Sequence, residues 1–155
     1  DRALAELGTM RAREGEALNS ILSERLDAIA ALLVRAERLP ERGVEAIKAR
    51  IAEQVRVLME AATLDPDRLH QEAVLAVTKA DVREELDRLG AHIAAARDLL
   101  HTGGPAGRRL DFLAQEFNRE ANTLCSKSNS VALTQIGLDL KLLVDQFREQ
   151  IQNLE

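Results

Sequence analysis

The chain has 155 residues, 46% hydrophobic and 30% charged, which is the composition of a globular domain and excludes a disordered polypeptide. Its net charge of −5 excludes nucleic-acid binding through bulk positive charge, and an aromatic content of 2% argues against base-stacking platforms. An anionic partner must therefore meet a local basic patch or a bridging metal ion.

Apolar residues recur at three- and four-residue steps along the whole chain, which predicts amphipathic helices. Five such segments follow one another: residues 2–39, 41–63, 65–101, 108–124 and 131–154. Pro40 ends the first, while Asp65 and Pro66 supply an N-cap and a first helical residue for the third. No run alternates with period two for long enough to predict a strand. The sequence therefore predicts an all-α fold of about five mostly long antiparallel helices, arranged as a bundle.

Two apolar surfaces carry further expectations about packing. The stripe of Leu86, Leu89 and Ile93 is expected to pack against the fourth or the last helix. On the last helix, Leu138 and Leu142 widen the apolar face beyond one seam, a pattern typical of a helix with two neighbours. We therefore expect the protein to self-associate.

The cysteine content and the apolar runs of the chain indicate its cellular compartment. A single cysteine, Cys125, cannot form an intramolecular disulfide and fits a reducing compartment. The longest apolar run, residues 28–34, is too short to span a bilayer, and no secretory leader opens the chain. We therefore expect a cytoplasmic protein that does not contact membranes.

Polar rows border the apolar stripes of the third and fourth predicted helices and include acids at helical spacing. Hard divalent cations bind oxygen ligands, and carboxylates from two facing helices with a nearby histidine can form such a site. The proposed metal ligands are Asp81, Glu85, His92, Glu116 and Glu120, of which the last four are the proposed catalytic residues. The residues proposed to contact a phosphodiester substrate are Arg88, Arg108, Arg109, Asn118, Arg119, Asn122 and Lys127.

Distances along the two helices rank the possible pairings. At about 1.5 Å per residue, His92 and Glu116 lie roughly 16 Å and 14 Å from the 103–107 turn, so they are nearly level. Glu85 and Glu120 lie roughly 27 Å and 20 Å from it, a poorer match. The alternative interpretation is that these rows are salt-bridged, solvated faces, with Arg88 and Arg119 neutralising the acids.

Residues 107–127, GRRLDFLAQEFNREANTLCSK, resemble the signature of the bacterial YicC-like endoribonuclease family. The segment 80–89 followed by His92, the opening 10–15 and the ending 149–155 also resemble this family, so the likeness covers essentially the whole chain. Cys125 is a departure, because the family more often has glycine there. By this resemblance, residues 1–155 are the C-terminal helical domain of a YicC-like protein whose N-terminal domain is absent.

The resemblance implies a cytoplasmic, metal-dependent endoribonuclease that hydrolyses RNA within a homo-hexamer, with Mn²⁺ or Mg²⁺ as cofactor. The family's polar motif maps onto one further set of residues besides the ligands and contacts above: Glu84, Asp111, Gln115 and Thr123. The alternative function is a non-catalytic helical module for assembly or RNA interaction. In that case each acid is expected to pair with a basic side chain.

Overall fold

A computed structural model describes residues 2–40, 43–61 and 65–152 of the chain. Within these ranges it contains helices and no strand. The helices are α1 (Arg2–Glu37), α2 (Val44–Ala61), α3 (Pro66–Ala80), α4 (Arg83–Thr102), α5 (Gly107–Lys127) and α6 (Val131–Gln152). The predicted all-α, bundle-like architecture is confirmed.

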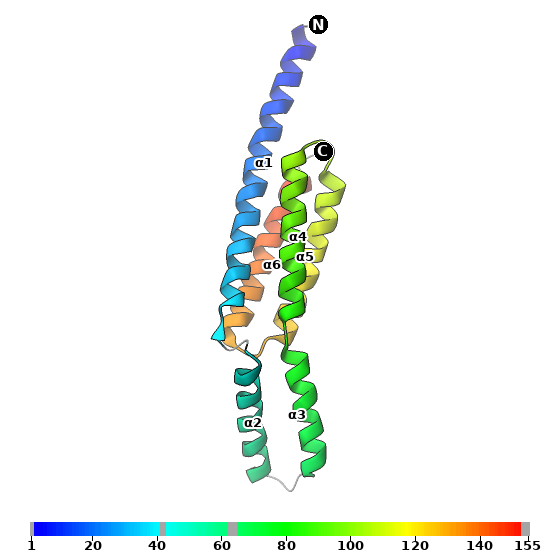
Figure 1. Cartoon of the computed structure of the whole chain (residues 1–155). Helices are drawn as coiled ribbons and strands as arrows, with labels where there is room; N and C mark the ends of the chain where they lie inside the picture. The colour runs from blue at the N-terminus through cyan, green and yellow to red at the C-terminus, as the bar shows by residue number, and fades with distance from the viewer. Residues whose placement is uncertain (1, 41–42, 62–64, 153–155) are drawn as a thin grey trace.

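Four of these helices form an antiparallel bundle (Figure 1). Around the bundle, α1 packs against α4 and α6, and α5 packs against the same two helices. The predicted stripe of Leu86, Leu89 and Ile93 is buried, and α4 packs on α5, the fourth helix of the sequence prediction. This arrangement places the polar rows of α4 and α5 beside each other.

The bundle core consists of aliphatic side chains with two phenylalanines at its centre. Phe117 of α5 and Phe147 of α6 are fully buried, with their ring centroids 5.8 Å apart. On α6, Leu138 and Leu142 remain 51% and 60% exposed, so the wider apolar face expected from the sequence lies on the surface of the monomer. Leu154, the last residue of the helix predicted over 131–154, lies outside the described residues.

The helix predicted over residues 65–101 is divided into α3 and α4, and this part of the prediction is wrong. Asp81 adopts an extended conformation, and its Oδ1 accepts a hydrogen bond of 2.9 Å from the backbone N–H of Arg83. An aspartate that bonds to the backbone two residues ahead competes with helical hydrogen bonding. Val82 is buried in the bundle core. The break therefore lets α4 join the bundle while α3 leaves it.

Local signals in the sequence set the other helix ends. Asp65 Oδ1 accepts from the N–H of Asp67 at 3.0 Å and caps α3 as predicted. Ser130 Oγ accepts from the N–H of Leu133 at 3.1 Å and caps α6. Between α4 and α5, Gly103 and Gly104 have φ of 71° and 82°, a conformation that glycine adopts without steric cost.

Two elements extend from opposite ends of the bundle (Figure 1). At one end, residues 2–17 of α1 continue beyond the bundle; we call this segment the arm. At the other end, α2 and α3 pair with each other; we call this pair the hairpin. None of the described helices has the length and the apolar composition needed to cross a membrane.

Close packing of α5 on α6 depends on Gly137. A Cβ at this position would lie 2.5 Å from Cys125 Sγ and 3.5 Å from the Cys125 backbone nitrogen. We expect Gly137→Ala to lower the free energy of unfolding by about 1–3 kcal/mol, because the added methyl overpacks the helix crossing. Urea denaturation measures the change. Gly8→Ala is the matched control, because a Cβ there meets nothing within 4 Å.

A second variant tests the cause of this loss. Cys125→Ala removes the sulfur that the new methyl meets, so the double variant Cys125→Ala/Gly137→Ala should recover most of the lost stability. Equal losses in the single Gly137→Ala variant and the double variant would contradict steric conflict with Cys125.

Candidate metal centre

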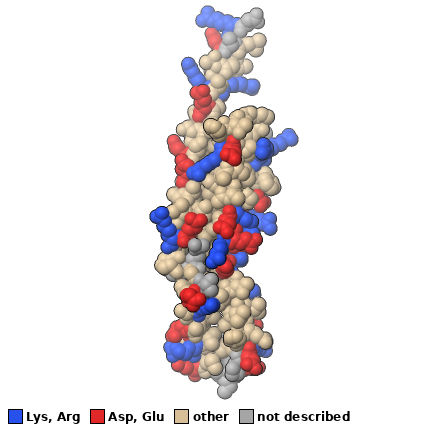
Figure 2. All heavy atoms as spheres, in the orientation of Figure 1, with Lys and Arg blue, Asp and Glu red and all other residues tan. Residues whose placement is uncertain are grey.

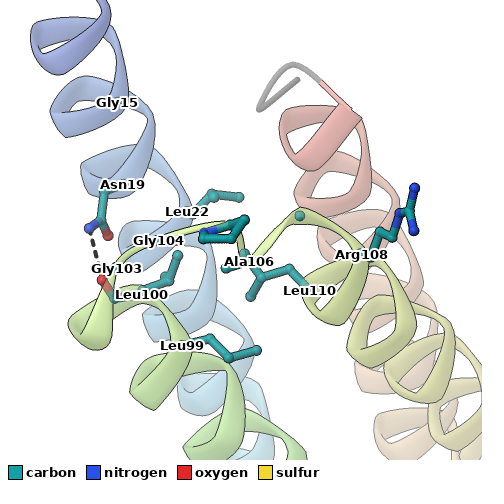
Figure 3. A pocket seen from close by; sticks show the side chains of 12 residues that line it. Gly15, Asn19, Leu22, Leu99, Leu100, Gly103, Gly104, Ala106, Arg108 and Leu110 are labelled. Carbon is teal, nitrogen blue, oxygen red and sulfur yellow. Dashed lines mark hydrogen bonds between the residues drawn. The ribbon is translucent and has the colours of Figure 1, made fainter.

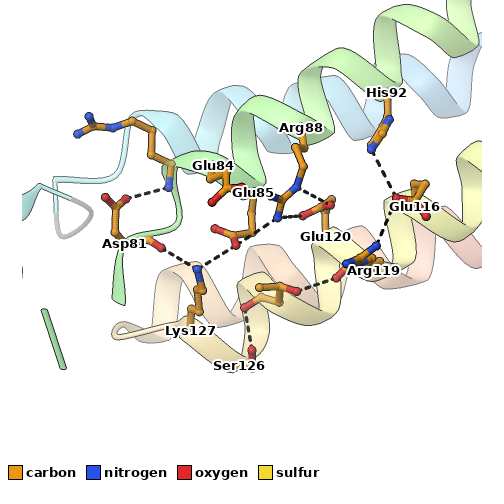
Figure 4. Close-up of polar contacts among 12 residues, drawn as sticks. Asp81, Glu84, Glu85, Arg88, His92, Glu116, Arg119, Glu120, Ser126 and Lys127 are labelled. Atoms are coloured by element: carbon orange, nitrogen blue, oxygen red, sulfur yellow. Dashed lines mark hydrogen bonds and ion pairs between the residues drawn. The ribbon is translucent and has the colours of Figure 1, made fainter. Parts of the chain in front are cut away.

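Acidic and basic side chains of α4 and α5 face one another where these two helices pack side by side (Figure 4); we call this line of contact the groove. The short turn at Gly103 and Gly104 makes the two helices antiparallel and sets His92 level with Glu116. One turn further along, Arg88 faces Glu120, and beyond it Glu85 faces Lys127. The predicted pairing of His92 with Glu116 is therefore present, whereas Glu85 lies beside Lys127 rather than Glu120.

Three of the five predicted metal ligands come together in this groove. His92, Glu116 and Glu120 each offer one ligand atom, and these atoms all lie within 4.8 Å of one another. The distance from His92 Nε2 to Glu116 Oε2 is 3.9 Å, too long for a hydrogen bond. One imidazole nitrogen and two carboxylate oxygens thus surround a point between α4 and α5.

The donor atoms of this cluster fit a divalent cation. His92 Nε2 is buried and has no hydrogen-bond partner. Buried polar nitrogens in native proteins are nearly always satisfied, so this atom is free to bind a ligand. Carboxylate oxygens are ligands for Mg²⁺ and Mn²⁺, and the imidazole favours Mn²⁺ because Mg²⁺ strongly prefers oxygen.

Arg88 is the main basic partner of the acids near this cluster. Its Nε and Nη2 donate to the two carboxylate oxygens of Glu120 at 2.9 and 3.0 Å, a bidentate pair. It also donates to Glu84 and, at 3.3 Å, to Glu85. The hydrogen bond to Glu120 raises the pKa of Arg88 above its usual range, and the neighbouring charges add to this effect against partial desolvation. The positive charge of Arg88 thereby balances the carboxylate charge of Glu120, which is only 1% exposed.

Glu85 belongs to a second ion pair at the end of the groove. Lys127 Nζ lies 2.9 Å from Glu85 Oε1 and also donates to the backbone oxygen of Asp81 at 3.2 Å. Glu85 is 3% exposed, and its Oε2 is buried without a hydrogen-bond partner. The Asp81 carboxylate accepts a hydrogen bond from the backbone N–H of Arg83. The structure therefore places Glu85 and Asp81 outside the three-residue cluster.

Three predicted RNA contacts lie along α5 at different distances from the cluster. Arg119 is exposed, and its Nη1 lies 3.9 Å from Glu116 Oε2. Arg109 is exposed, two helical turns before Glu116. Arg108 borders a pocket of about 530 Å³ at the end of the bundle, formed with the 103–107 loop, and its side chain points away from that loop (Figure 3).

Asn118 and Asn122 lie on another side of α5 from Glu116 and Glu120. Asn122 Nδ2 donates to Asn118 Oδ1 at 2.7 Å within the helix. Asp111 belongs to the same row and pairs with Arg148 of α6 at 3.0 Å. These asparagines therefore satisfy each other near the surface, away from the His92 cluster.

Phe117 is a buried core residue near the site that sequence reasoning did not connect with it. Its ring centroid lies 6.5 Å from that of His92. The ring thus contacts the imidazole from the core side. Its place in an apolar stripe predicts burial, but no sequence signal indicates contact with the histidine.

Comparison with known proteins places these features in a family. The family model for the C-terminal part of YicC-like endoribonucleases matches residues 36–155. A Haemophilus influenzae protein named "Probable endoribonuclease YicC" is 44% identical over the whole of this chain and 53% of its own length. A Clostridioides difficile protein of the same name is 32% identical over 99% of this chain and 53% of its own length.

The chain spans about half the length of these curated relatives. The family match includes α4, α5 and the groove between them. On this evidence, the chain belongs to the YicC-like endoribonuclease family and corresponds to its C-terminal part.

Proposed function

We propose that this chain is the helical domain of a metal-dependent endoribonuclease that hydrolyses RNA phosphodiesters. His92, Glu116 and Glu120 would hold the divalent cation, Mn²⁺ or Mg²⁺. One observation carries the proposal: ligand atoms of three residues, His92 among them, lie within 4.8 Å of one another, and His92 Nε2 is buried without a hydrogen-bond partner. The names of the curated relatives support RNA as the substrate.

The residues of the groove would have different roles in hydrolysis. When bound, a divalent cation supplies Lewis-acid chemistry, activating water and offsetting charge on the phosphodiester. Arg119, exposed beside Glu116, would hold a phosphate of the RNA backbone. Lys127 would hold a second phosphate at the far end of the groove. Glu85 would keep the Lys127 ammonium in place through the 2.9 Å ion pair.

Arg88 has a conditional role in this proposal. It occupies both carboxylate oxygens of Glu120, so cation binding must compete with this bidentate pair. An arginine released from Glu120 would lie next to the cation, where it can bind a phosphate oxygen of the substrate. We further propose that the enzyme acts within the cytoplasm as a homo-oligomer, a hexamer by resemblance to the family.

The test replaces Glu116 with glutamine, which keeps the shape of the side chain and removes its charge. Because Glu116 contributes one of three ligands, we expect Glu116→Gln to weaken Mn²⁺ binding by at least about 10-fold, as loss of even a supporting residue can do. Isothermal titration calorimetry measures binding, and a gel of labelled RNA with and without Mn²⁺ measures cleavage. Cleavage should fall with occupancy of the site.

Glu84→Gln is the matched control for this experiment. Glu84 also lies near Arg88, but it is exposed and outside the three-residue cluster. Its replacement should leave Mn²⁺ affinity within about twofold of the unmodified protein. Unchanged binding and an unchanged metal requirement in Glu116→Gln would remove Glu116 from the site.

The second candidate function is a non-catalytic module for assembly or RNA interaction. It is favoured by the ion pairs that neutralise Glu85 and Glu120 through Lys127 and Arg88. In this case the acids stabilise helix packing, and the chain should bind neither Mn²⁺ nor Mg²⁺ at the groove. The calorimetric titration separates the two candidates before any assay of RNA cleavage.

A further inference from the structure

In the part of the chain that the structure describes, two buried side-chain atoms have no hydrogen-bond partner, His92 Nε2 and Glu85 Oε2. Both belong to the groove. The proposed metal centre accounts for the first atom, because an imidazole nitrogen is a cation ligand. It does not account for the second, since Glu85 lies outside the three-residue cluster. Leaving a buried carboxylate oxygen without a donor costs free energy, so Glu85 Oε2 is a strong acceptor with capacity for one more donor.

Arg88 is the donor best placed to reach this oxygen. It follows Glu85 by three residues on α4, a spacing at which two side chains are neighbours on the helix surface. Figure 4 shows its guanidinium between the carboxylates of Glu85 and Glu120. The bond from Arg88 Nη2 to Glu85 Oε1 is long, 3.3 Å, whereas the two bonds to Glu120 are 2.9 and 3.0 Å. Arg88 thus holds Glu120 closely and Glu85 loosely.

We propose that Arg88 exchanges Glu120 for Glu85 when Glu120 binds the cation, which makes Glu85 a positioning residue of the metal centre. The two oxygens of Glu85 then serve two donors: Oε1 keeps Lys127, and Oε2 receives Arg88. His92 Nε2 binds the cation in the same arrangement, so both unpartnered buried atoms gain a partner. The inference rests on the metal site of the proposed function, but it does not depend on RNA cleavage.

The charges of the groove favour this exchange. Glu116 and Glu120 together balance a divalent cation, so the positive charge of Arg88 is no longer needed there. A guanidinium that stayed beside the cation would be repelled by it. Glu84 and Glu85 supply two negative charges on α4, and Arg88 already donates to both. Its transfer toward them separates the like charges. A guanidinium has more N–H donors than Glu85 can accept, so the others remain available for a phosphate oxygen of the substrate.

Glu85 thereby lowers the free-energy cost of cation binding. When Glu120 turns to a cation, two charge-assisted hydrogen bonds from Arg88 break. Glu85 offers replacement bonds, and it is only 3% exposed, an environment in which hydrogen bonds are electrostatically stronger than in water. Without Glu85, Arg88 has the exposed carboxylate of Glu84 and the solvent. The affinity for the cation is therefore expected to depend on Glu85 through Arg88.

The test is a double-mutant cycle on Mn²⁺ affinity, measured by isothermal titration calorimetry. Glu85→Gln keeps one oxygen for Lys127 and places an NH₂ group at the other position, so it removes the acceptor proposed for Arg88. The proteins compared are the unmodified chain, Glu85→Gln, Arg88→Met and the double variant. Far-UV circular dichroism checks that each is helical before titration. Arg88→Gln, a neutral donor to Glu120, replaces Arg88→Met in the cycle if the methionine variant is not helical.

We expect Glu85→Gln to raise the Mn²⁺ dissociation constant about 10-fold when Arg88 is present, a loss typical of residues that support a metal ligand. In the Arg88→Met background, the same substitution should change the constant by less than about threefold, because no guanidinium has to relocate. Glu84→Gln is the matched control. Glu84 also accepts from Arg88, but its side chain is 77% exposed, so its replacement should change the constant by less than about twofold.

Three outcomes would overturn the exchange. Equal losses of affinity in the two backgrounds mean that Glu85 acts through its own charge or as a ligand, independently of Arg88. Unchanged affinity in Glu85→Gln means that Arg88 leaves Glu120 without help from Glu85, and the metal centre stands as proposed. An unmodified chain that does not bind Mn²⁺ lacks both the metal centre and the exchange. Conversely, a cycle with the expected coupling and no RNA cleavage supports the exchange and contradicts only the enzymatic proposal.

Discussion

Replacement of Arg88 by methionine is expected to lower the melting temperature (Tm) of the chain by about 10 °C, because it leaves a buried carboxylate without its positive partner. Glu120 is 1% exposed, and both of its oxygens accept hydrogen bonds from Arg88. Methionine retains the length of the aliphatic stem but supplies no charge. Thermal unfolding followed by circular dichroism measures the shift.

A double variant isolates the buried charge as the cause. Arg88→Met/Glu120→Met removes both charges, and its Tm should return close to that of the unmodified chain, since buried ion pairs can often be replaced by apolar residues. Mn²⁺ should raise the Tm of Arg88→Met more than that of the unmodified chain, because a cation held by Glu120 replaces the missing positive charge. An equal Mn²⁺ effect in both would argue against competition between Arg88 and a cation for Glu120.

Replacement of Phe117 by alanine is expected to lower the free energy of unfolding by about 3–5 kcal/mol. Phe117 is fully buried and packs against Phe147 at the centre of the bundle. The cavity left by its ring would also remove the support on the core side of His92. Urea denaturation measures the stability, and calorimetry with Mn²⁺ tests whether the histidine remains in position.

Phe117→Leu is the control that keeps most of the apolar volume. It should cost less than about 1.5 kcal/mol and change Mn²⁺ affinity little. A double-mutant cycle with Phe147→Leu should reveal a coupling of about 0.5–1.5 kcal/mol between the rings. A Phe117→Ala variant as stable as Phe117→Leu would contradict the central role of this ring in the core.

The apolar spacing of the sequence predicted most of the helices because burial of a stripe is a property of each helix by itself. The stripe of Leu86, Leu89 and Ile93 identified the buried side of α4. It did not predict the division at Asp81, where the backbone is extended. There, a local side-chain hydrogen bond and the packing of Val82 in the bundle outweigh helical continuity.

For the candidate site too, helical spacing predicted some features and not others. Counting residues from a tight turn predicted that His92 and Glu116 are level, since α-helices rise by a constant amount per residue. The same count ranked Glu85 with Glu120 as the poorer match, and these two residues bind different partners. Asn118 and Asn122 share a helix with Glu116, but their side chains point elsewhere around it.

The sequence by itself determined most of the helices, the turn that makes α4 and α5 antiparallel, and the residue types available in their polar rows. Only the tertiary structure decided which acids have basic partners. Helical spacing places Arg88 within reach of Glu84 and Glu85, yet its bidentate partner is Glu120, 32 residues away on another helix. Pairing across two helices depends on their separation and rotation, which the packing of the whole core fixes.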